Sequence, residues 1–314
     1  MLRDQGRFHL LNRNAILWGI LCCVLSQPLQ ADQTHELRAR LSTSNSSGSL
    51  TKVEYSGLRL DGGAELTVIS PKEWRETASF LIGTLEETHN NYLEVFGTIP
   101  KFSVTVRLMD EETFYLSTGA PSWTNAMYFK GQIVIPLPMD GKVDRDNMTR
   151  SIRHEYTHAV IHALSGGNCP GWLDEGLAQW AEGEVNPLLT QALNEWLAVH
   201  PAVPFKLLQG GFTKLPAAMV PAAYAQSLLG TKLLLNNFGL KGIGEFLSFL
   251  RLGKKERDAF RLAFQSSRSE IEQSVISELP RLVLREKNPD DVRAELLQTS
   301  VRYRAKTVSL EHQK

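Results

Sequence analysis

The segment His154-Glu155-Tyr156-Thr157-His158 places two histidines four residues apart, with a glutamate directly after the first. On an α-helix this spacing puts both imidazoles on one side, one turn apart. Counted around the helix axis from His154 at roughly 100° per residue, His158 falls at about 40° and Glu155 at about 100°. Glu155 therefore borders the imidazole face, where a general base can take a proton from a water molecule held by a metal ion.

Glu175 is the candidate for the third protein ligand, which a catalytic zinc site needs beside an open fourth position. A glycine pair at 166–167 predicts the end of the histidine helix, and a second helix-like segment begins at Trp172. A helix that folds back there can bring Glu175 to the histidines. A carboxylate leaves the ion more positive than a thiolate would, so the ion keeps its power to acidify water. The predicted site is one zinc ion held by His154, His158 and Glu175, with Glu155 as the base.

The alternative to a metal site is a helix that happens to carry two surface histidines. The five-residue motif does not exclude that alternative by itself. The segment Trp172-Leu173-Asp174-Glu175-Gly176, which follows at a fitting distance after a glycine-rich turn, favours the zinc site.

HEYTH followed by WLDEGLAQW resembles the gluzincin metallopeptidases, in which one helix carries HExxH and the next carries the third ligand. Within them the chain is most similar to the bacterial peptidase MA-like group, which also has a helix like Ala223-Tyr224-Ala225-Gln226-Ser227 further on. The resemblance covers roughly residues 103–265, and the close matches are confined to three short stretches. It implies a zincin-like fold and hydrolysis of peptide bonds. No Gly-Ala-Met-Glu-Asn segment precedes the histidine helix, so the aminopeptidase branch is not supported.

Tyr224 is a further catalytic candidate, because the resemblance implies a tyrosine on a helix downstream of the ligands. Attack on an amide forms an oxyanion, and a phenol donor beside the zinc would stabilise that charge where it develops. A tyrosine that only packs in the core is the alternative, and the sequence leaves both open.

Other polar residues near the motifs have competing interpretations. Glu182 follows Glu175 by seven residues on the same helix face, where it either accepts the free N–H of a ligand imidazole or lies at a solvated helix end. His162 shares the histidine side but stands roughly 12 Å along the axis from His154, so we expect a structural role. Cys169 precedes the second helix, yet a thiolate ligand would close the position that water needs.

The composition suits a globular enzyme. The 314 residues are 42% hydrophobic and 22% charged, enough for one large domain or two small ones. The totals of acidic and basic residues are equal, at 34 each, which argues against a nucleic-acid or membrane-surface binder. We therefore expect no nucleic-acid partner, while the resemblance implies a peptide or protein substrate; the oligomeric state stays open.

The first 31 residues have the pattern of an export signal. Three arginines precede a short apolar run at 15–25, and Leu29-Gln30-Ala31 offers a small residue before a cleavage point. The run is shorter than the roughly 20 residues that span a bilayer, so it favours a cleaved signal over an anchor. The expected location is the periplasm or the exterior of a bacterium. Cys169 would then be the mature chain's only cysteine, which excludes an internal disulfide.

The rest of the chain divides by composition. A polar linker is expected at 32–50, a zincin-like domain at 51–285 and a charged tail at 286–314. Within the domain, the part at 51–138 is expected to hold a small mixed sheet, and the part at 139–285 to be mainly helical and to carry the metal. The predicted fold class is thus α+β.

Periodicity predicts individual elements inside this domain. Strands are expected at 102–108 and 132–135 and a helix at 72–96, and prolines interrupt the helical pattern of 144–252. The resemblance implies an edge strand that binds the substrate backbone antiparallel to itself. The matching stretch is 126–135, with Gly131 at a turn or bulge.

The sequence favours an exported zinc metallopeptidase with a glutamate base. An amidase that acts on cell-wall material fits the same ligands, because pocket shape and not ligand identity sets the substrate. A catalytically silent peptide-binding module of the same fold is a third possibility, and the intact Glu155 argues against it.

Overall fold

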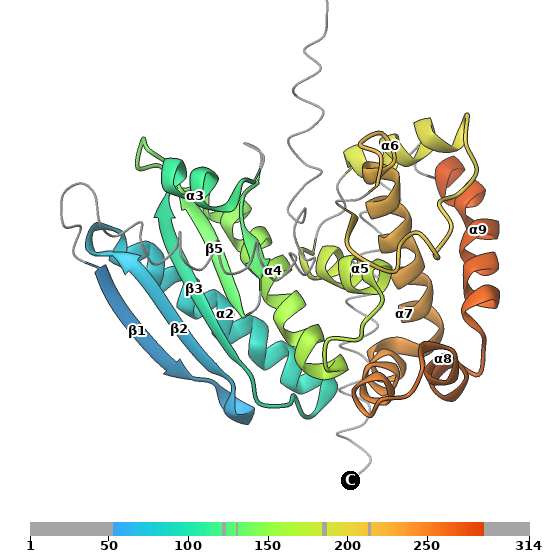
Figure 1. Cartoon of the computed structure of the whole chain (residues 1–314), viewed down its shortest axis with the longest axis horizontal. Helices are drawn as coiled ribbons and strands as arrows, with labels where there is room; N and C mark the ends of the chain where they lie inside the picture. The colour runs from blue at the N-terminus through green and yellow to red at the C-terminus, as the bar shows by residue number, and fades with distance from the viewer. Residues whose placement is uncertain (1–52, 121–123, 130, 184–186, 213–214, 286–314) are drawn as a thin grey trace, which may run out of the picture.

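The computed structural model describes residues 53–120, 124–129, 131–183, 187–212 and 215–285 (Figure 1). The export signal expected at 1–31, the linker at 32–50 and the tail at 286–314 lie outside these residues. No helix in the described part of the chain is long and apolar enough to cross a membrane.

A five-stranded mixed sheet forms the first half of the described chain (Figure 1). Its strands in chain order are β1 (Val53–Arg59), β2 (Glu65–Pro71), β3 (Ser103–Asp110), β4 (Met127–Phe129) and β5 (Gln132–Leu137). Their order across the sheet is β1-β2-β3-β5-β4, with β1 and β4 antiparallel to their neighbours and the inner pairs parallel. The strands expected at 102–108 and 132–135 correspond to β3 and β5.

The expected edge strand at 126–135 is corrected by the structure. Only β4 forms the edge, while β5 lies between β4 and β3 and pairs on both sides. The turn between them contains Gly131 with φ +80°, a conformation that glycine adopts without strain. The prediction from the sequence had treated β4 and β5, the two strands of one hairpin, as a single strand.

Helices cover both faces of the sheet. Val104 and Val106 of β3 belong to the main hydrophobic core together with residues of α2 (Arg75–Phe96) and α4 (Arg145–Ser165). Side chains that point to the other face of the sheet, such as Met109 and Val134, form a smaller cluster with Phe114 of α3 (Glu111–Thr118). The helix expected at 72–96 is confirmed as α2, which a short 3-10 turn precedes, whereas α3 was not expected.

The second half of the described chain is helical (Figure 1). It contains α5 (Gly171–Ala181), α6 (Pro187–Leu197), α7 (Val220–Arg251), α8 (Glu256–Phe264) and α9 (Arg268–Arg285). The prolines at 201, 204 and 216 lie between α6 and α7, as expected. This succession of a mixed sheet and a helical half confirms the predicted α+β, zincin-like fold class.

Helix α5 packs against both α4 and α7, and a glycine permits the close approach to α7. A Cβ atom added at Gly176 would lie 2.1 Å from Oγ1 of Thr231 and 2.4 Å from the carbonyl oxygen of Ser227. Any side chain there would push the two helices apart. Gly176 therefore fixes the position of its neighbour Glu175 relative to α7.

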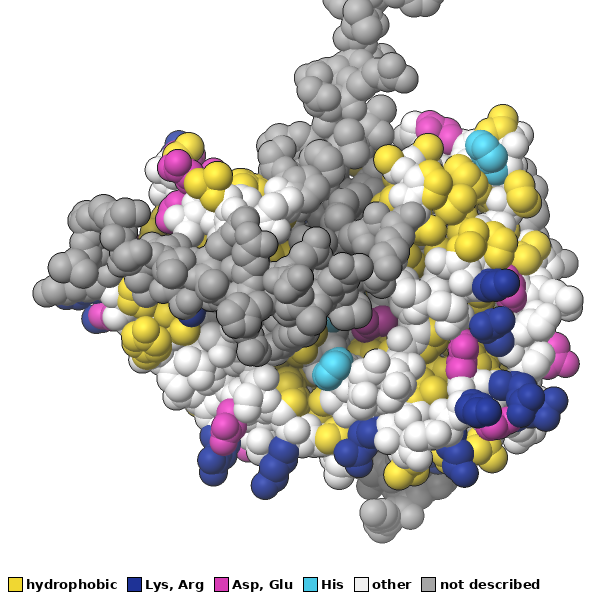
Figure 2. Space-filling model, in the orientation of Figure 1, with side chains coloured by type: hydrophobic (Ala, Val, Ile, Leu, Met, Phe, Trp, Pro, Cys, Tyr) yellow, Lys and Arg dark blue, Asp and Glu magenta, His cyan; other side chains and the backbone are white. Residues whose placement is uncertain are grey.

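Basic and acidic side chains are interspersed around the periphery of the face shown in Figure 2. They do not gather into one continuous surface of a single sign among the atoms coloured there.

Candidate metal centre

Helix α4 begins and ends where its sequence dictates. Asp144 is its N-cap, and the Oδ1 atom of that side chain accepts a hydrogen bond from the backbone N–H of Asn147 at 3.0 Å. Gly166 ends the helix in the left-handed conformation with φ 63°. The glycine pair thus terminates the histidine helix as expected, and it leaves a short loop before α5.

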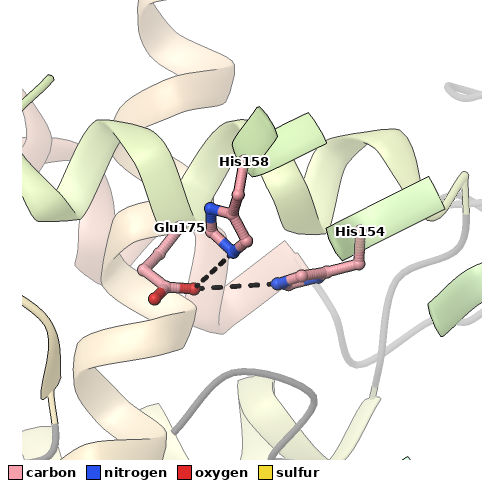
Figure 3. A group of neighbouring side chains, drawn as sticks. All are labelled: His154, His158 and Glu175. Carbon is pink, nitrogen blue, oxygen red and sulfur yellow. Dashed lines mark ion pairs between the residues drawn. The ribbon is translucent and has the colours of Figure 1, made fainter. Parts of the chain in front are cut away.

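The three expected ligands lie together between α4 and α5 (Figure 3). Oε2 of Glu175 is 3.7 Å from Nε2 of His154 and 3.8 Å from Nε2 of His158. Each of the three side chains is at most 2% exposed. Ligand atoms about 2.0–2.2 Å from a tetrahedral zinc ion are separated by about 3.4 Å, so a small contraction would bring these three into coordination.

The donor set also suits a catalytic ion. Two imidazoles and one carboxylate are the protein ligands of several hydrolytic zinc sites, in which a fourth position stays open to water. Their ligand atoms all lie within 4.8 Å of one another. The residues present therefore fit a zinc ion.

A carboxylate holds the outer nitrogen of each histidine. Nδ1 of His154 is 2.6 Å from Oε1 of Glu182, and Nδ1 of His158 is 3.0 Å from Oδ1 of Asp174. Such partners fix the ring orientation and direct the Nε2 atoms toward the ion. Glu182 is the partner that its helix spacing suggested, whereas Asp174 was missed, although it directly precedes Glu175.

These carboxylates also raise the pKa values of the histidines. Burial alone would lower the pKa of His154, yet Glu175 and Glu182 hold it well above its usual value. Burial opposes the shift at His158 as well, but the charge and hydrogen bond of Asp174 raise the pKa of His158 to about 9. The pocket is thus built to hold positive charge, which a metal ion supplies when it displaces the protons.

Glu155 lies beside the ligands and contacts the edge strand. Its Oε2 atom accepts a hydrogen bond from the backbone N–H of Tyr128 in β4 at 2.6 Å. The side chain is 2% exposed, and burial raises the pKa of its carboxyl although both histidines and Tyr128 oppose the shift. A carboxylate with a raised pKa is a stronger proton acceptor, as a general base requires.

The two residues between Glu155 and His158 anchor α4 to α2. Tyr92 of α2 donates to Oγ1 of Thr157 at 2.6 Å, and that hydroxyl donates to the backbone carbonyl of Arg153. Tyr156 donates to Nδ1 of His89 at 2.9 Å, because Nε2 of that ring is bound to the carbonyl of Asp61. The contacts with Tyr92 and His89 hold α4 against α2 in the sheet half.

Tyr224 lies on α7, which packs against α5. Its side chain is 2% exposed and its ring meets Phe212 edge to face, with the centroids 4.9 Å apart. Its backbone carbonyl accepts a hydrogen bond from Nε2 of Gln179 at 3.0 Å, one helical turn beyond Glu175. The position of the ring agrees with a packing role, and the catalytic role stays a prediction.

His162 and Cys169 are not part of the three-ligand group found among the described residues. Both line a cavity beside His158. Trp172 is fully buried in the core, whereas Trp180 is 36% exposed and Trp196 is partly buried.

The fold and the site together define a zincin-like protein with a candidate metal centre of two histidines and a glutamate. The model of the Peptidase MA superfamily matches residues 111–274, a stretch that includes both motif segments and Tyr224. The chain belongs to this family.

Solved structures with a similar fold include the M1 zinc metallopeptidase from Deinococcus radiodurans. That structure is 17% identical, with 72% of this chain and 51% of that chain covered and a TM-score of 0.38. A variant of the same enzyme bound to a Tyr-Ser-Ala substrate is 16% identical, with 71% and 50% covered and a TM-score of 0.40. The chain thus spans about half the length of these proteins. No curated protein matches the sequence.

Proposed function

We propose that the chain is a zinc-dependent metallopeptidase in which His154, His158 and Glu175 hold one ion and Glu155 is the general base. The main observation behind this proposal is that three candidate ligand side chains are buried together, with the carboxylate of Glu155 beside them. The family match adds a peptidase context.

A bound zinc ion would supply Lewis acidity, which lowers the pKa of water and polarises the carbonyl of the scissile amide. Glu155 then takes the proton of the attacking water and returns it to the leaving amine. The hydrogen bond from Tyr128 holds one oxygen of Glu155, so the carboxylate is oriented before substrate arrives. Asp174 and Glu182 hold the histidine rings in place.

The edge strand β4 supports a peptide substrate. A strand edge binds an extended peptide through main-chain hydrogen bonds, and β4 is the edge next to Glu155. A cell-wall amidase would use the same ligands, and a silent binding module would use the same edge without hydrolysis. Substrate profiling separates these three.

The test combines metal analysis with a cleavage profile. Purified protein should contain about one zinc per chain by elemental mass spectrometry. It should also cleave members of a diverse peptide mixture, and the Glu155→Gln protein should not. Cleavage of cell-wall fragments alone would identify the amidase, and binding without any cleavage would identify the module.

Tyr224→Phe tests the second catalytic assignment. If the hydroxyl donates to the oxyanion only in the transition state, the substitution should lower kcat by about 10²–10³ and leave KM nearly unchanged. Steady-state kinetics on a quenched peptide measure both constants. A tyrosine that only packs against Phe212 would give a lower melting temperature with near-normal kcat in the folded fraction.

Export is a further proposal, which the basic start and short apolar run of the sequence support. We expect the mature protein to begin near Gln27 or Asp32 when its N-terminus is sequenced from the producing cells. An intact Met1 on protein recovered from the cytoplasm would overturn it.

A further inference from the structure

A cavity of about 380 Å³ lies beside the metal centre on the side of His158. Its volume falls in the range of about 300–1,000 Å³ that small-ligand pockets have. The cavity therefore has room for a small group, and two residues of its lining belong to the proposed site: His158, and Tyr128, which donates to Glu155. The lining includes Tyr128, Phe129, Ile161, His162, Cys169 and Asp174.

The ionisable side chains of this lining include one carboxylate and the histidines His158 and His162. Among the described residues that form it, Asp174 is the carboxylate, and there is no lysine or arginine. Its Oδ1 atom is buried at 3.0 Å from Nδ1 of His158, while the side chain as a whole is 24% exposed. The accessible part of Asp174 therefore forms a negative portion of the cavity wall.

Two other ionisable groups of the lining, Tyr128 and Cys169, carry no charge that could offset Asp174. Burial raises the pKa of Tyr128 to about 12, and Asp174 adds to that rise. Burial also raises the pKa of the Cys169 thiol, with further contributions from Asp174 and then Glu256. Both groups stay protonated and neutral, so they do not offset the carboxylate.

The neighbouring metal centre does not offset it either. Glu175 lies against Nε2 of both histidines, Glu182 contacts Nδ1 of His154, and the charge of Glu155 interacts with both rings. Together with Asp174 they make four carboxylates around a site for one divalent cation. The surroundings of the cavity are thus suited to a positively charged group.

The rest of the lining suits a long side chain that has an apolar stem and a charged end. Tyr128 of β4 contributes an aromatic residue whose ring stacks 6.5 Å from that of His158, and Ile161 adds an aliphatic surface from α4. Lysine and arginine bury their methylene stems along such surfaces while the charged end reaches a polar partner. Aromatic faces also attract cations directly.

We infer that this cavity is a substrate subsite that selects a cationic group, an ammonium or a guanidinium, through the carboxylate of Asp174. The inference rests on the proposed peptidase function, because it assigns a substrate class to the same site. If Asp174 only oriented His158, an uncharged hydrogen-bond acceptor would serve equally well and no cation would be selected.

The cation has two possible sources in a peptide, a lysine or arginine side chain and the free α-amino group. Blocked peptides of the form acetyl-Ala-Ala-Xaa-Ala-Ala-Ala-amide, with Xaa moved along the chain, report on the side chain. All-alanine peptides with a free or an acetylated N-terminus report on the α-amino group.

Binding is measured on the full-length, zinc-loaded Glu155→Gln protein, in which turnover is expected to stop. A lysine or arginine peptide, or the peptide with a free N-terminus, should bind about 10-fold or more tightly than its norleucine or acetylated counterpart, since hydrogen bonds to charged groups are the stronger ones. Adding Asp174→Asn should bring that ratio close to one, because the amide can still accept from His158 but carries no charge.

A second variant leaves the histidine partners untouched. Gln209 lines the cavity, and its Nε2 atom lies 3.4 Å from Oε1 of Glu256. Gln209→Lys retains a donor for Glu256 and adds a positive charge to the wall, so the preference for cations should fall. The exposed substitution Glu87→Gln on α2 is the matched control, and it should leave the preference unchanged.

The outcomes separate this inference from the proposed function. Equal binding of lysine, norleucine and glutamate peptides, or a cation preference that survives both cavity variants, overturns the subsite even if the wild-type protein hydrolyses peptides. Cation-selective binding that both cavity variants weaken supports the subsite even if the wild-type protein cleaves nothing, in which case only the peptidase proposal fails.

Discussion

Replacing Glu155 by glutamine is expected to abolish hydrolysis while the metal stays bound. The amide has nearly the shape of the carboxylate, and its oxygen can still accept the hydrogen bond from the backbone of Tyr128. It cannot take a proton from water, however, and a positioned base typically contributes about 10²–10⁴ in rate. Turnover of a quenched peptide should therefore fall at least that far, with zinc content equal to that of the wild-type protein.

Glu87→Gln is the matched control for this experiment. Glu87 is an exposed residue of α2 whose side chain pairs with Arg153 of α4 at 3.4 Å, so the same chemical change is made next to α4 but outside the site. Its turnover should match that of the wild-type protein. Wild-type turnover in Glu155→Gln would show that another group is the base.

Local spacing was enough to predict which candidate ligands share one helix face. The four-residue interval between His154 and His158 fixes their relation on α4, and the glycine pair fixes where that helix ends. Glu182 follows from the same helical arithmetic, counted from Glu175, whereas Glu175 itself was predicted from the WLDEG segment and a helix that folds back after the glycine pair. Relations within one helix can be read from the sequence because they depend on its periodicity alone.

Relations between elements were harder to predict. The contact of Asp174 with His158 depends on the angle at which α5 packs against α4. The hydrogen bond from Tyr128 to Glu155 depends on where β4 lies against α4. Neither angle nor distance between elements has a signature in a single sequence.

The hairpin of β4 and β5 shows a further limit. Both arms are apolar and share a short turn, so periodicity did not separate the edge strand from its buried neighbour. The pairing of β5 with β3 is a parallel contact between distant segments, and it alone decides which arm is the edge. The ring of Tyr224 is a similar case, because its surroundings depend on how α7 meets the loop that contains Phe212.

Glu175→Ala should remove the zinc ion. The carboxylate is one of only three expected ligands and the only one with a negative charge, so its loss weakens coordination and leaves the charge of the ion less compensated. Substitution of a residue that only hydrogen-bonds to a metal ligand typically lowers the metal affinity by about 10–100-fold. Glu175 is itself an expected ligand, so we expect its loss to lower the zinc affinity by more than about 100-fold. Competition with a chromophoric chelator measures the affinity.

Thermal unfolding provides an independent measurement, because a ligand that binds only the native state stabilises it. Added zinc should raise the melting temperature of the wild-type protein and leave that of Glu175→Ala unchanged. Glu195→Ala, at an exposed position on α6, should respond like the wild-type protein. Full zinc occupancy in Glu175→Ala would show that another residue is the third ligand, and it would move the proposed reaction site away from the group drawn in Figure 3.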